Sequence, residues 1–355
     1  MKGIILHAGH GTRLRPLTHT GPKQLLPIAN KPMSEYCVES LKNCGITEIA
    51  IVIGGIGSNK VKEYYGDGKK FDVRFSYIEQ DSPKGIAHAI ALCKDFVNNE
   101  KFIVFLGDNF INTSIQDFIT DFDDSTFDAS LLLCEVNNPQ QFGIAYLDGD
   151  KISKMIEKPK NPTSNLAITG IYLLTPKIFS KIEKLTPSWR NEYEIVDALQ
   201  MLLDDGGRIS YDVITEFWKD TGTPDDIIHA NRIILENIKH VMMGIIENDV
   251  EITGSLSLGK NSVIKSGCKI IGPVIIGDNC TIDHNSMIGS NVSIGNNSKI
   301  FNCKIEDSIV MNNCLIDTKT SIIDSIIAQN SHILSESSTP EKKKFLLGEG
   351  TKISL

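Results

Sequence analysis

Short apolar runs alternate with longer stretches of helical spacing along the first two thirds of the chain. The apolar runs are rich in Ile and Val, as is typical of strands that a parallel sheet buries on both faces. The predicted strands are Gly3–Leu6, Glu48–Ile53, Val73–Ile78, Phe102–Leu106, Ala129–Glu135 and Ala167–Leu174. The predicted helices are Met33–Asn43, Lys84–Phe96, Glu192–Leu203 and Pro224–Ile238. This alternation predicts an α/β domain in which crossover helices connect the strands.

A different period begins after about residue 250, where the helical spacing stops. Branched aliphatic side chains then recur at every sixth position: Leu258, Ile264, Ile270, Ile276, Ile282, Ile288, Ile294 and Ile300. Small or compact residues follow the first seven of these by four positions: Ser262, Cys268, Val274, Cys280, Ser286, Val292 and Ser298. The period resembles the hexapeptide repeat of left-handed parallel β-helices, in which three six-residue units form one triangular coil.

Three parts of the chain follow from these two patterns. We expect residues 1–242 to form the α/β domain and residues 243–334 to form the β-helix. The six-residue spacing loosens beyond Ile300, but apolar positions continue as far as Ile333. Residues 335–355 read as an exposed linker followed by a short C-terminal tail.

Composition narrows the class of protein. The chain has 355 residues, of which 41% are hydrophobic and 23% charged, which excludes disordered and collagen-like proteins. Its formal net charge of −8 argues against a nucleic-acid partner, because such proteins need an excess of cations. The eight cysteines form no C-x-x-C pair, and no apolar run is long enough to span a membrane. We therefore expect a cytoplasmic protein with free thiols and no membrane partner.

The glycine-rich segment after the first predicted strand carries the clearest chemical signal. It runs from Leu6 through Gly9 and Gly11 to Pro16. Glycines let backbone amides approach a ligand closely, and successive amides form a site for anions. Residues 1–34 contain no Asp or Glu, and they carry the five cations Lys2, Arg13, Arg15, Lys23 and Lys31. This local excess of positive charge predicts a polyphosphate ligand.

Two familiar phosphate loops do not match this segment. A Walker loop requires Lys after its last glycine, and Thr12 follows Gly11 here. The dinucleotide fingerprint G-x-G-x-x-G begins at Gly9, but Leu14 stands where the third glycine should be.

The run Gly11-Thr12-Arg13-Leu14-Arg15-Pro16-Leu17-Thr18, followed by Lys23-Gln24-Leu25, resembles the signature of sugar-phosphate nucleotidyltransferases. Together with Gly107-Asp108-Asn109 and the hexapeptide repeat, it is similar to the long form of glucose-1-phosphate thymidylyltransferases. The resemblance implies a Rossmann-like nucleotidyltransferase domain with a mixed, mostly parallel sheet, followed by the left-handed β-helix. Two positions depart from the family: Ala8 replaces a glycine, and Lys84 stands where many relatives have Asp.

The resemblance also implies the site residues. Those expected to bind the nucleotide are Leu6, Ala8, Gly9, Gly11, Thr12, Arg13, Lys23, Gln24, Gln80, Gly85 and Asp108. Those expected to bind the sugar phosphate are Asn109, Gly143, Glu157, Lys158, Thr169, Gly170 and Arg190. Asp108 and Asp220 are expected to bind Mg²⁺, which agrees with the preference of this hard cation for carboxylates and phosphates.

The implied reaction is the transfer of a nucleotidyl group from dTTP, or UTP, to glucose 1-phosphate, with release of pyrophosphate. No protein nucleophile is needed, because the attacking phosphate is already ionised. The catalytic residues would be Arg13 at the leaving pyrophosphate, Lys23 and Lys158 at phosphates, and Asp108 through Mg²⁺. The repeat also favours a homo-oligomer, because solenoid ends are open.

Two alternatives remain at this point. The first is a bifunctional enzyme that uses UTP and whose β-helix also acetylates an amino-sugar phosphate, with His284 or His332 as the base. The second is a sugar-nucleotide-binding scaffold without catalysis. Retention of Arg13, Lys23 and Lys158 beside the two aspartates argues against the scaffold, because binding alone does not need a metal pair.

Overall fold

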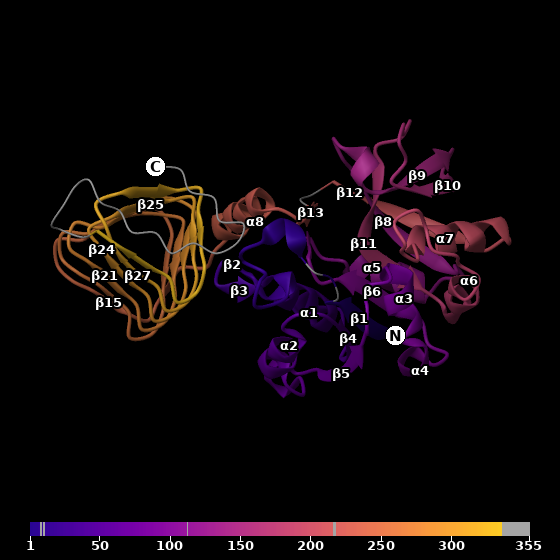
Figure 1. Ribbon diagram of the computed structural model, residues 1–355, viewed down its shortest axis with the longest axis horizontal. Helices are drawn as coiled ribbons and strands as arrows, with labels where there is room; N and C mark the ends of the chain where they lie inside the picture. The colour runs from indigo at the N-terminus through magenta and orange to yellow at the C-terminus, as the bar shows by residue number, and fades with distance from the viewer. Residues whose placement is uncertain (8, 10, 112, 216–217, 336–355) are drawn as a thin grey trace. The chain divides into compact units, whose positions relative to one another are not determined.

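The computed structural model describes residues 1–335 except 8, 10, 112 and 216–217, and it gives no account of the Lys219 and Asp220 side chains. The chain forms two compact units (Figure 1). The first, here called the sheet unit, consists of Met1–Thr12, Thr18–Leu25 and Met33–Asp220. The second, the solenoid unit, consists of Arg13–Leu17, Leu26–Pro32 and the chain from Thr221 onward. Each unit therefore contains segments that are distant in sequence.

A nine-stranded sheet forms the centre of the sheet unit, in the order β10-β9-β11-β6-β1-β4-β5, with β8 and β12 following beside β11. The strands are β1 (Lys2–Leu6), β4 (Glu48–Ile53), β5 (Arg74–Glu79), β6 (Phe102–Leu106), β8 (Ala129–Glu135), β9 (Gly143–Asp148), β10 (Lys151–Glu157), β11 (Leu166–Leu174) and β12 (Ile209–Ile214). Strands β6, β1, β4 and β5 run parallel, whereas β11 is antiparallel to β6 and to β8. The expected mixed, mostly parallel sheet is confirmed.

Helices cover both faces of this sheet. One apolar core contains side chains of α1 (Met33–Asn43), α2 (Ser58–Tyr65) and α5 (Gln116–Asp123). The other contains side chains of α3 (Ile86–Ala91), α4 (Lys94–Val97), α6 (Phe179–Ile182) and α7 (Ile195–Asp204). Side chains along β1 alternate between the two cores, since Ile4 and Leu6 belong to one and Ile5 to the other. Burial on both faces explains why the central strands are continuous apolar runs.

Three of the four predicted helices are shorter than their apolar spacing indicates. The predicted helix Lys84–Phe96 is two helices, α3 and α4, with a turn between them. Helix α3 starts only after Gly85, whose φ of 101° is not helical. The predicted helix Glu192–Leu203 starts at Ile195, because the residues before it make the polar contacts of the site described below. Met33–Asn43 is confirmed, and α8 (Pro224–Glu236) ends two residues before its predicted end.

The solenoid unit contains three parallel sheets, which together form a left-handed β-helix as expected. The first sheet consists of β14 (Val241–Met242), β17 (Leu256–Leu258), β20 (Val274–Ile276), β23 (Val292–Ile294), β26 (Ile309–Val310) and β29 (Ile326–Ile327). The second consists of β15 (Ile245–Ile246), β18 (Val263–Ile264), β21 (Thr281–Asp283), β24 (Lys299–Phe301), β27 (Leu315–Asp317) and β30 (His332–Leu334). The third consists of β16 (Glu251–Thr253), β19 (Lys269–Ile271), β22 (Met287–Ile288), β25 (Lys304–Glu306) and β28 (Ser321–Ile323).

The six-residue period has the physical meaning that the sequence predicts. Ile264 pairs with Ile282, and Ile282 pairs with Ile300, so one coil takes eighteen residues. All three side chains are fully buried in the solenoid core. Beyond Ile300 the coil shortens, because Ile300 pairs with Ile316 only sixteen residues later. The regular period is lost there because the turns tighten, while the stack of strands continues.

Helix α8 and a small hairpin pack against the β-helix within the solenoid unit. The hairpin consists of β2 (Pro27–Ile28) and β3 (Lys31–Pro32). The fully buried Asn231 of α8 accepts hydrogen bonds from Ala29 N at 2.9 Å and from Ser293 Oγ at 2.5 Å. It also donates to Asn291 O at 3.1 Å. One side chain thus connects helix, hairpin and solenoid. Among the described residues, no helix is long and apolar enough to span a membrane.

Candidate functional site

The glycine-rich loop leaves the carboxyl end of β1, between two neighbouring strands. Backbone hydrogen bonds hold its start, from His7 N to Val52 O at 2.8 Å and from Gly107 N to Leu6 O at 3.0 Å. Gly9 has a φ of 136° and Gly11 a φ of 56°. These values favour glycine strongly, because a Cβ is strained in this region. Thr18 Oγ1 donates to Gly11 O at 2.8 Å and supports the loop. Of the residues expected here, Ala8 lies outside the described residues.

The loop continues into the 3₁₀ turn η1 (Thr12–Leu14), which contains the expected residues Thr12 and Arg13. Arg13 belongs to the solenoid unit. A Cβ on Gly222 would lie 2.9 Å from Arg13 Nη2, so Gly222 leaves room for the guanidinium group. The sequence alone did not single out Gly222.

Lys23 and Asp108 form the first polar cluster of the sheet unit. Lys23 lies in the 3₁₀ turn η2 (Lys23–Leu25), and Asp108 follows the carboxyl end of β6. The Lys23 ammonium donates to Asp108 Oδ2, and both side chains are mostly buried. Burial favours the protonated acid, but the Lys23 charge and hydrogen bonds from Lys23 and Asn109 hold the pKa of Asp108 below its ordinary value. Asp108 is therefore a carboxylate that already faces a cation.

Gln24, the neighbour of Lys23, is also expected to bind the nucleotide. Its side chain is 1% exposed, and its Oε1 has no hydrogen-bond partner among the described residues. Nearby, a Cβ on Gly107 would meet Gln24 Cγ at 3.1 Å and His7 Cδ2 at 3.0 Å. Burial is the main reason why the pKa of His7 is lowered to about 3, so its imidazole is neutral. The start of the loop therefore packs against two uncharged, buried side chains, those of His7 and Gln24.

Asn109 connects the Lys23 and Asp108 cluster to β11. Its Nδ2 donates to Asp108 Oδ1 at 3.3 Å, and its Oδ1 accepts from Gly170 N at 3.1 Å. The same oxygen accepts from Trp218 Nε1 at 2.9 Å. A Cβ on Gly170 would lie 2.7 Å from Asn109 Cγ, so glycine is needed at this position. The sequence predicted Asn109 and Gly170 but missed Trp218, for which it contains no local signal.

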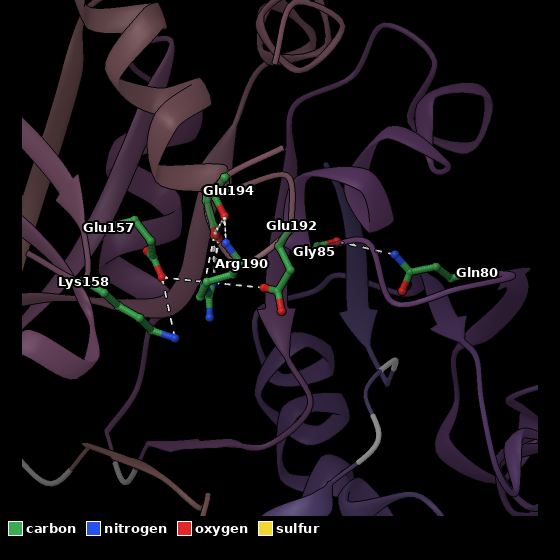
Figure 2. A network of polar contacts seen from close by, with 8 residues as sticks. Gln80, Gly85, Glu157, Lys158, Arg190, Glu192 and Glu194 are labelled. Carbon is green, nitrogen blue, oxygen red and sulfur yellow. Dashed lines mark hydrogen bonds and ion pairs between the residues drawn. The ribbon is translucent and has the colours of Figure 1, made fainter. Parts of the chain in front are cut away.

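A second polar cluster forms around Arg190 (Figure 2). The Arg190 guanidinium donates to Glu194 at 2.8 Å and 2.9 Å, and it lies 2.9 Å from a Glu192 oxygen and 3.4 Å from a Glu157 oxygen. Lys158 Nζ lies 3.9 Å from the same Glu157 oxygen. The expected sugar-side residues Glu157, Lys158 and Arg190 are thus brought together. Glu192 and Glu194 were missed as site residues, although their motif was visible in the sequence.

Local backbone geometry sets this cluster in place. Gly143 of β9 pairs with Glu157 of β10, and a Cβ on Gly143 would lie 3.1 Å from Glu157 Oε2. Lys158 has a φ of 44°, which is unusual for a residue with a side chain, and its N donates to Phe142 O at 3.0 Å. Burial, together with the nearby Glu194 charge, raises the pKa of Glu157 to about 7, although Lys158 and Arg190 oppose this shift.

Thr169, the remaining residue expected at the sugar side, lies in β11 beside Gly170. Its Oγ1 is buried and has no hydrogen-bond partner among the described residues. Ile171 pairs with Phe105 in antiparallel register, so Thr169 and Gly170 lie beside the strand end that Asp108 follows. A buried hydroxyl without a partner is costly in a folded protein, which marks Thr169 as a group able to bind a ligand.

Gln80 and Gly85, expected to read the base, lie together after the end of β5 (Figure 2). Gln80 Nε2 lies 3.4 Å from Gly85 O and 2.8 Å from His88 Nδ1. Gly85 has a φ of 101°, and a Cβ there would lie 2.5 Å from Tyr193 O. Tyr193 lies between Glu192 and Glu194, so the segment that holds the sugar-side cluster also supports the expected base-reading loop.

The expected metal site can be assessed at Asp108. A buried, ionised carboxylate is the kind of oxygen donor that Mg²⁺ prefers, so Asp108 fits this role. The backbone of Asp220 in β13 (Trp218–Asp220) pairs with that of Asn109 in β7 (Asn109–Ile111). Asn109 directly follows Asp108 in the sequence. The Asp220 side chain lies outside the described residues. The described side chains contain no group of three or more His, Cys, Asp or Glu that could hold a metal ion.

The fold and these polar clusters define a class of enzyme that joins phosphate-bearing substrates at the carboxyl edge of a sheet. The chain belongs to the nucleotidyl transferase family, whose model matches residues 2–237. A second model, the GMPPB C-terminal domain, matches residues 270–354.

Several relatives match over most of their length. The low-salt glycan biosynthesis nucleotidyltransferase Agl11 of Haloferax volcanii is 42% identical over 100% of both chains. A glucose-1-phosphate thymidylyltransferase of Streptomyces antibioticus is 36% identical over 100% of this chain and 99% of its own. A Bacillus anthracis crystal structure in complex with sucrose, described as a glucose-1-phosphate thymidylyltransferase, has a TM-score of 0.64 and 40% identity over 68% of this chain and 98% of its own. This chain is therefore a sugar-phosphate nucleotidyltransferase.

Proposed function

We propose that the enzyme transfers a thymidylyl group from dTTP to α-D-glucose 1-phosphate, giving dTDP-glucose and pyrophosphate, in a reaction that depends on Mg²⁺. The observation that carries the proposal is the Lys23 and Asp108 cluster at the end of β6, next to the glycine-rich loop of β1. The names of the full-length Streptomyces relatives support dTTP and glucose 1-phosphate as the substrates.

In this reaction an oxygen of the sugar phosphate forms a bond to the α-phosphorus of dTTP. The bond from the α-phosphorus to the bridging oxygen breaks, and pyrophosphate leaves with that electron pair. The main difficulty is to bring two polyanions together. Arg13 and the loop amides would stabilise the leaving pyrophosphate, Lys158 would hold the attacking phosphate, and Lys23 would position the triphosphate.

The expected sugar contacts belong to the Arg190 cluster. Arg190 already donates to three carboxylates, so we assign it to holding Glu157 in place rather than to binding phosphate. Glu157 would then accept hydrogen bonds from sugar hydroxyls. Lys158 is the cation of this cluster that remains 32% exposed, and it is the one suited to the phosphate.

Asp108, together with Asp220, would hold the metal. When bound, Mg²⁺ supplies positive charge that neutralises phosphate oxygens in the transition state. Lys23 contacts one oxygen of Asp108, so the chain itself already keeps this carboxylate ionised and oriented.

The test is pyrophosphate release in the presence of Mg²⁺ from dTTP, UTP, ATP, GTP or CTP, each combined with glucose 1-phosphate or glucosamine 1-phosphate. We expect dTTP with glucose 1-phosphate to give the highest kcat/KM. Fast pyrophosphate release with another nucleotide and slow release with dTTP would show that dTTP is not the substrate. The assignment of the enzyme as a nucleotidyltransferase would still hold.

Replacement of Asp108 tests the site itself. Asp108→Asn removes the negative charge that faces Lys23 and the metal, so we expect kcat to fall about a hundredfold or more, while the circular dichroism spectrum is retained. Asp95→Asn, at an exposed position of α4, is the matched control and should leave kcat unchanged. Normal activity of Asp108→Asn at saturating Mg²⁺ would contradict the assignment.

One contact supports the alternative of a second activity in the β-helix. His284 Nδ1 lies 2.9 Å from Asp283 Oδ1, an arrangement that could orient the imidazole as a base. Lys265 already pairs with the other Asp283 oxygen at 2.5 Å, which weakens the effect of that carboxylate on His284. Consumption of acetyl-CoA with glucosamine 1-phosphate, lost in His284→Ala, would establish this activity.

A further inference from the structure

Two neighbours hold the Gln80 side-chain amide, the Gly85 carbonyl group and the His88 imidazole. Gln80 Nε2 lies 2.8 Å from His88 Nδ1 and 3.4 Å from Gly85 O. The Gln80 side chain is almost fully buried, so its amide has little freedom to exchange these contacts for water. His88 lies in α3, three residues after Gly85, and had no assigned role in the sequence.

These two contacts fix the orientation of the amide and the state of the imidazole. The Gly85 carbonyl oxygen can only accept, so the NH₂ end of the amide must face it. An amide nitrogen only donates, so His88 Nδ1 must be the acceptor and must carry no proton. A flipped amide would place its oxygen against the Gly85 oxygen, which is repulsive. The His88 proton therefore lies on Nε2.

The surroundings of His88 agree with a neutral imidazole. Burial lowers the pKa of His88, the nearby Lys84 charge lowers it further, and Asp81 opposes the shift. Lys84 Nζ lies 3.7 Å from Asp81 Oδ2. The Tyr193 ring stacks against the imidazole, with ring centroids 6.4 Å apart and planes at 29°. Among the described residues, Lys84, Asp81 and Tyr193 are the titratable groups that face His88.

With both amide hydrogens directed at protein acceptors, Gln80 Oε1 is the atom that remains for a ligand. It has no hydrogen bond from any residue that the structure describes. An acceptor in this position suits a base that offers a ring N–H, as N3 of thymine and uracil does. Cytosine has a lone pair at N3, so it would place two acceptors against each other.

We infer that His88 is a positioning residue for base selection: its unprotonated Nδ1 holds the Gln80 amide so that Oε1 faces the base and favours thymine or uracil over cytosine. This inference rests on the proposed function in one respect, which is that Gln80 contacts the base. Without His88, or with a proton on Nδ1, the amide can turn and present Nε2 to the base. A cytosine N3 would then be tolerated.

Two substitutions separate this role from simple packing. His88→Leu fills part of the space but offers no acceptor, whereas His88→Asn offers an acceptor near the position of Nδ1. His240→Leu, at an exposed position between α8 and β14, is the control with the same change of residue. For each full-length variant, the dissociation constants of dTTP and dCTP with Mg²⁺ are measured by calorimetry, and kcat and KM are measured with glucose 1-phosphate.

We expect His88→Leu to lower the dTTP-over-dCTP preference about tenfold, the effect of one lost base contact, mainly through KM. His88→Asn should retain most of the preference, and His240→Leu all of it. In the wild type the preference should stay constant from pH 8 to pH 6.5, because burial and the Lys84 charge lower the pKa of His88 and leave Nδ1 without a proton in this range. Both nucleotides carry the same triphosphate, so the ratio cancels the titration of the phosphates.

A preference in His88→Leu within twofold of the wild type would overturn the inference. So would an equal loss of the preference in His88→Leu and His88→Asn, because that pattern indicates packing alone. Failure of the proposed function looks different: no nucleotide then releases pyrophosphate. The binding ratios still test His88 in that case, because they do not require turnover.

Discussion

At Glu157 the fold works against the ordinary ionisation of a carboxylic acid. Burial and the Glu194 charge raise the pKa of Glu157 to about 7, despite the nearby Lys158 and Arg190 cations. Glu194 is the closer partner of Arg190, because its two carboxylate oxygens lie 2.9 and 2.8 Å from Arg190 Nη2. The nearest Glu157 oxygen lies 3.4 Å from the same nitrogen. A carboxyl group near neutrality can change its hydrogen-bonding role when a sugar phosphate arrives.

The stability of the protein should report this shift. The folded pKa of Glu157 lies above its ordinary value of 4.5, so between these values the folded protein holds a proton that the unfolded chain has released. Stability from this group therefore falls as pH rises from about 4.5 to about 7. Glu157→Gln has no such proton. The free energy of unfolding of Glu157→Gln minus that of the wild type should therefore increase by about 2 to 3 kcal/mol from pH 4.5 to pH 8.

Urea unfolding at the two pH values measures this difference. Other titrating groups are common to both proteins and cancel. Glu63→Gln, at an exposed position of α2, is the control. A difference that stays constant with pH would mean that Glu157 ionises as an ordinary carboxylic acid does.

The sequence predicted individual residues of the two polar clusters better than it predicted their partners. Asn109, Gly143, Glu157 and Gly170 were expected from motifs, and the structure shows the contacts that require them. Trp218 was not expected, since the Asn109 that it contacts lies far away in sequence. Nothing local in the chain indicates such a pair.

Among the elements, α8 depends both on local sequence signals and on tertiary contacts. Its start is local, because Thr223 caps the helix, Pro224 follows, and Asp226 completes a capping box. Its packing depends on Asn231, whose carbonyl oxygen accepts from Ala29 N and Ser293 Oγ and whose amide nitrogen donates to Asn291 O. A buried asparagine with these partners is a connecting residue rather than an ordinary helix position.

Removal of the Asn231 side chain should destabilise the solenoid unit. Asn231→Ala leaves the buried Ala29 N–H unpaired and opens a small cavity, so we expect a loss of about 2 to 4 kcal/mol in the free energy of unfolding. Asn237→Ala, at the exposed C-terminal end of the same helix, should cost less than about 1 kcal/mol. Urea denaturation of both variants tests this, and equal losses would contradict the role of Asn231.

A ladder of asparagines along the solenoid was missed by the sequence reading. All five asparagines of the ladder have a φ between 56° and 62°: Asn261, Asn279, Asn297, Asn313 and Asn330. The Nδ2 of each of the first four donates to the Oδ1 of the next at 3.1 or 3.2 Å. Asparagine is one of the few residues that adopt this left-handed conformation readily. The aliphatic period predicted the coils, but the corners depend on this second, polar period.

At the scale of the whole molecule, all eight cysteines are unpaired and six are buried; Cys44 and Cys134 are partly exposed. Burial raises the pKa of the buried thiols, to about 12 for Cys93 and Cys303. We therefore expect a thiol reagent to modify at most two cysteines in the native protein and all eight after unfolding. The melting temperature should not change when a reducing agent is added. A reducible disulfide, or rapid labelling of more than two thiols, would contradict this.

Local patterns determined much of this protein. Apolar periodicity predicted the α/β part and the β-helix because a side chain's face depends on the period of its own element. The glycine-rich loop and its acid-free surroundings predicted a phosphate site because these are properties of neighbouring residues. Only the tertiary structure decided the partners: Gln80 with His88, Asn231 with Ala29 and Ser293, and Glu157 among competing charges. Such contacts and pKa values depend on which segments the fold brings together and on how much water it excludes from them.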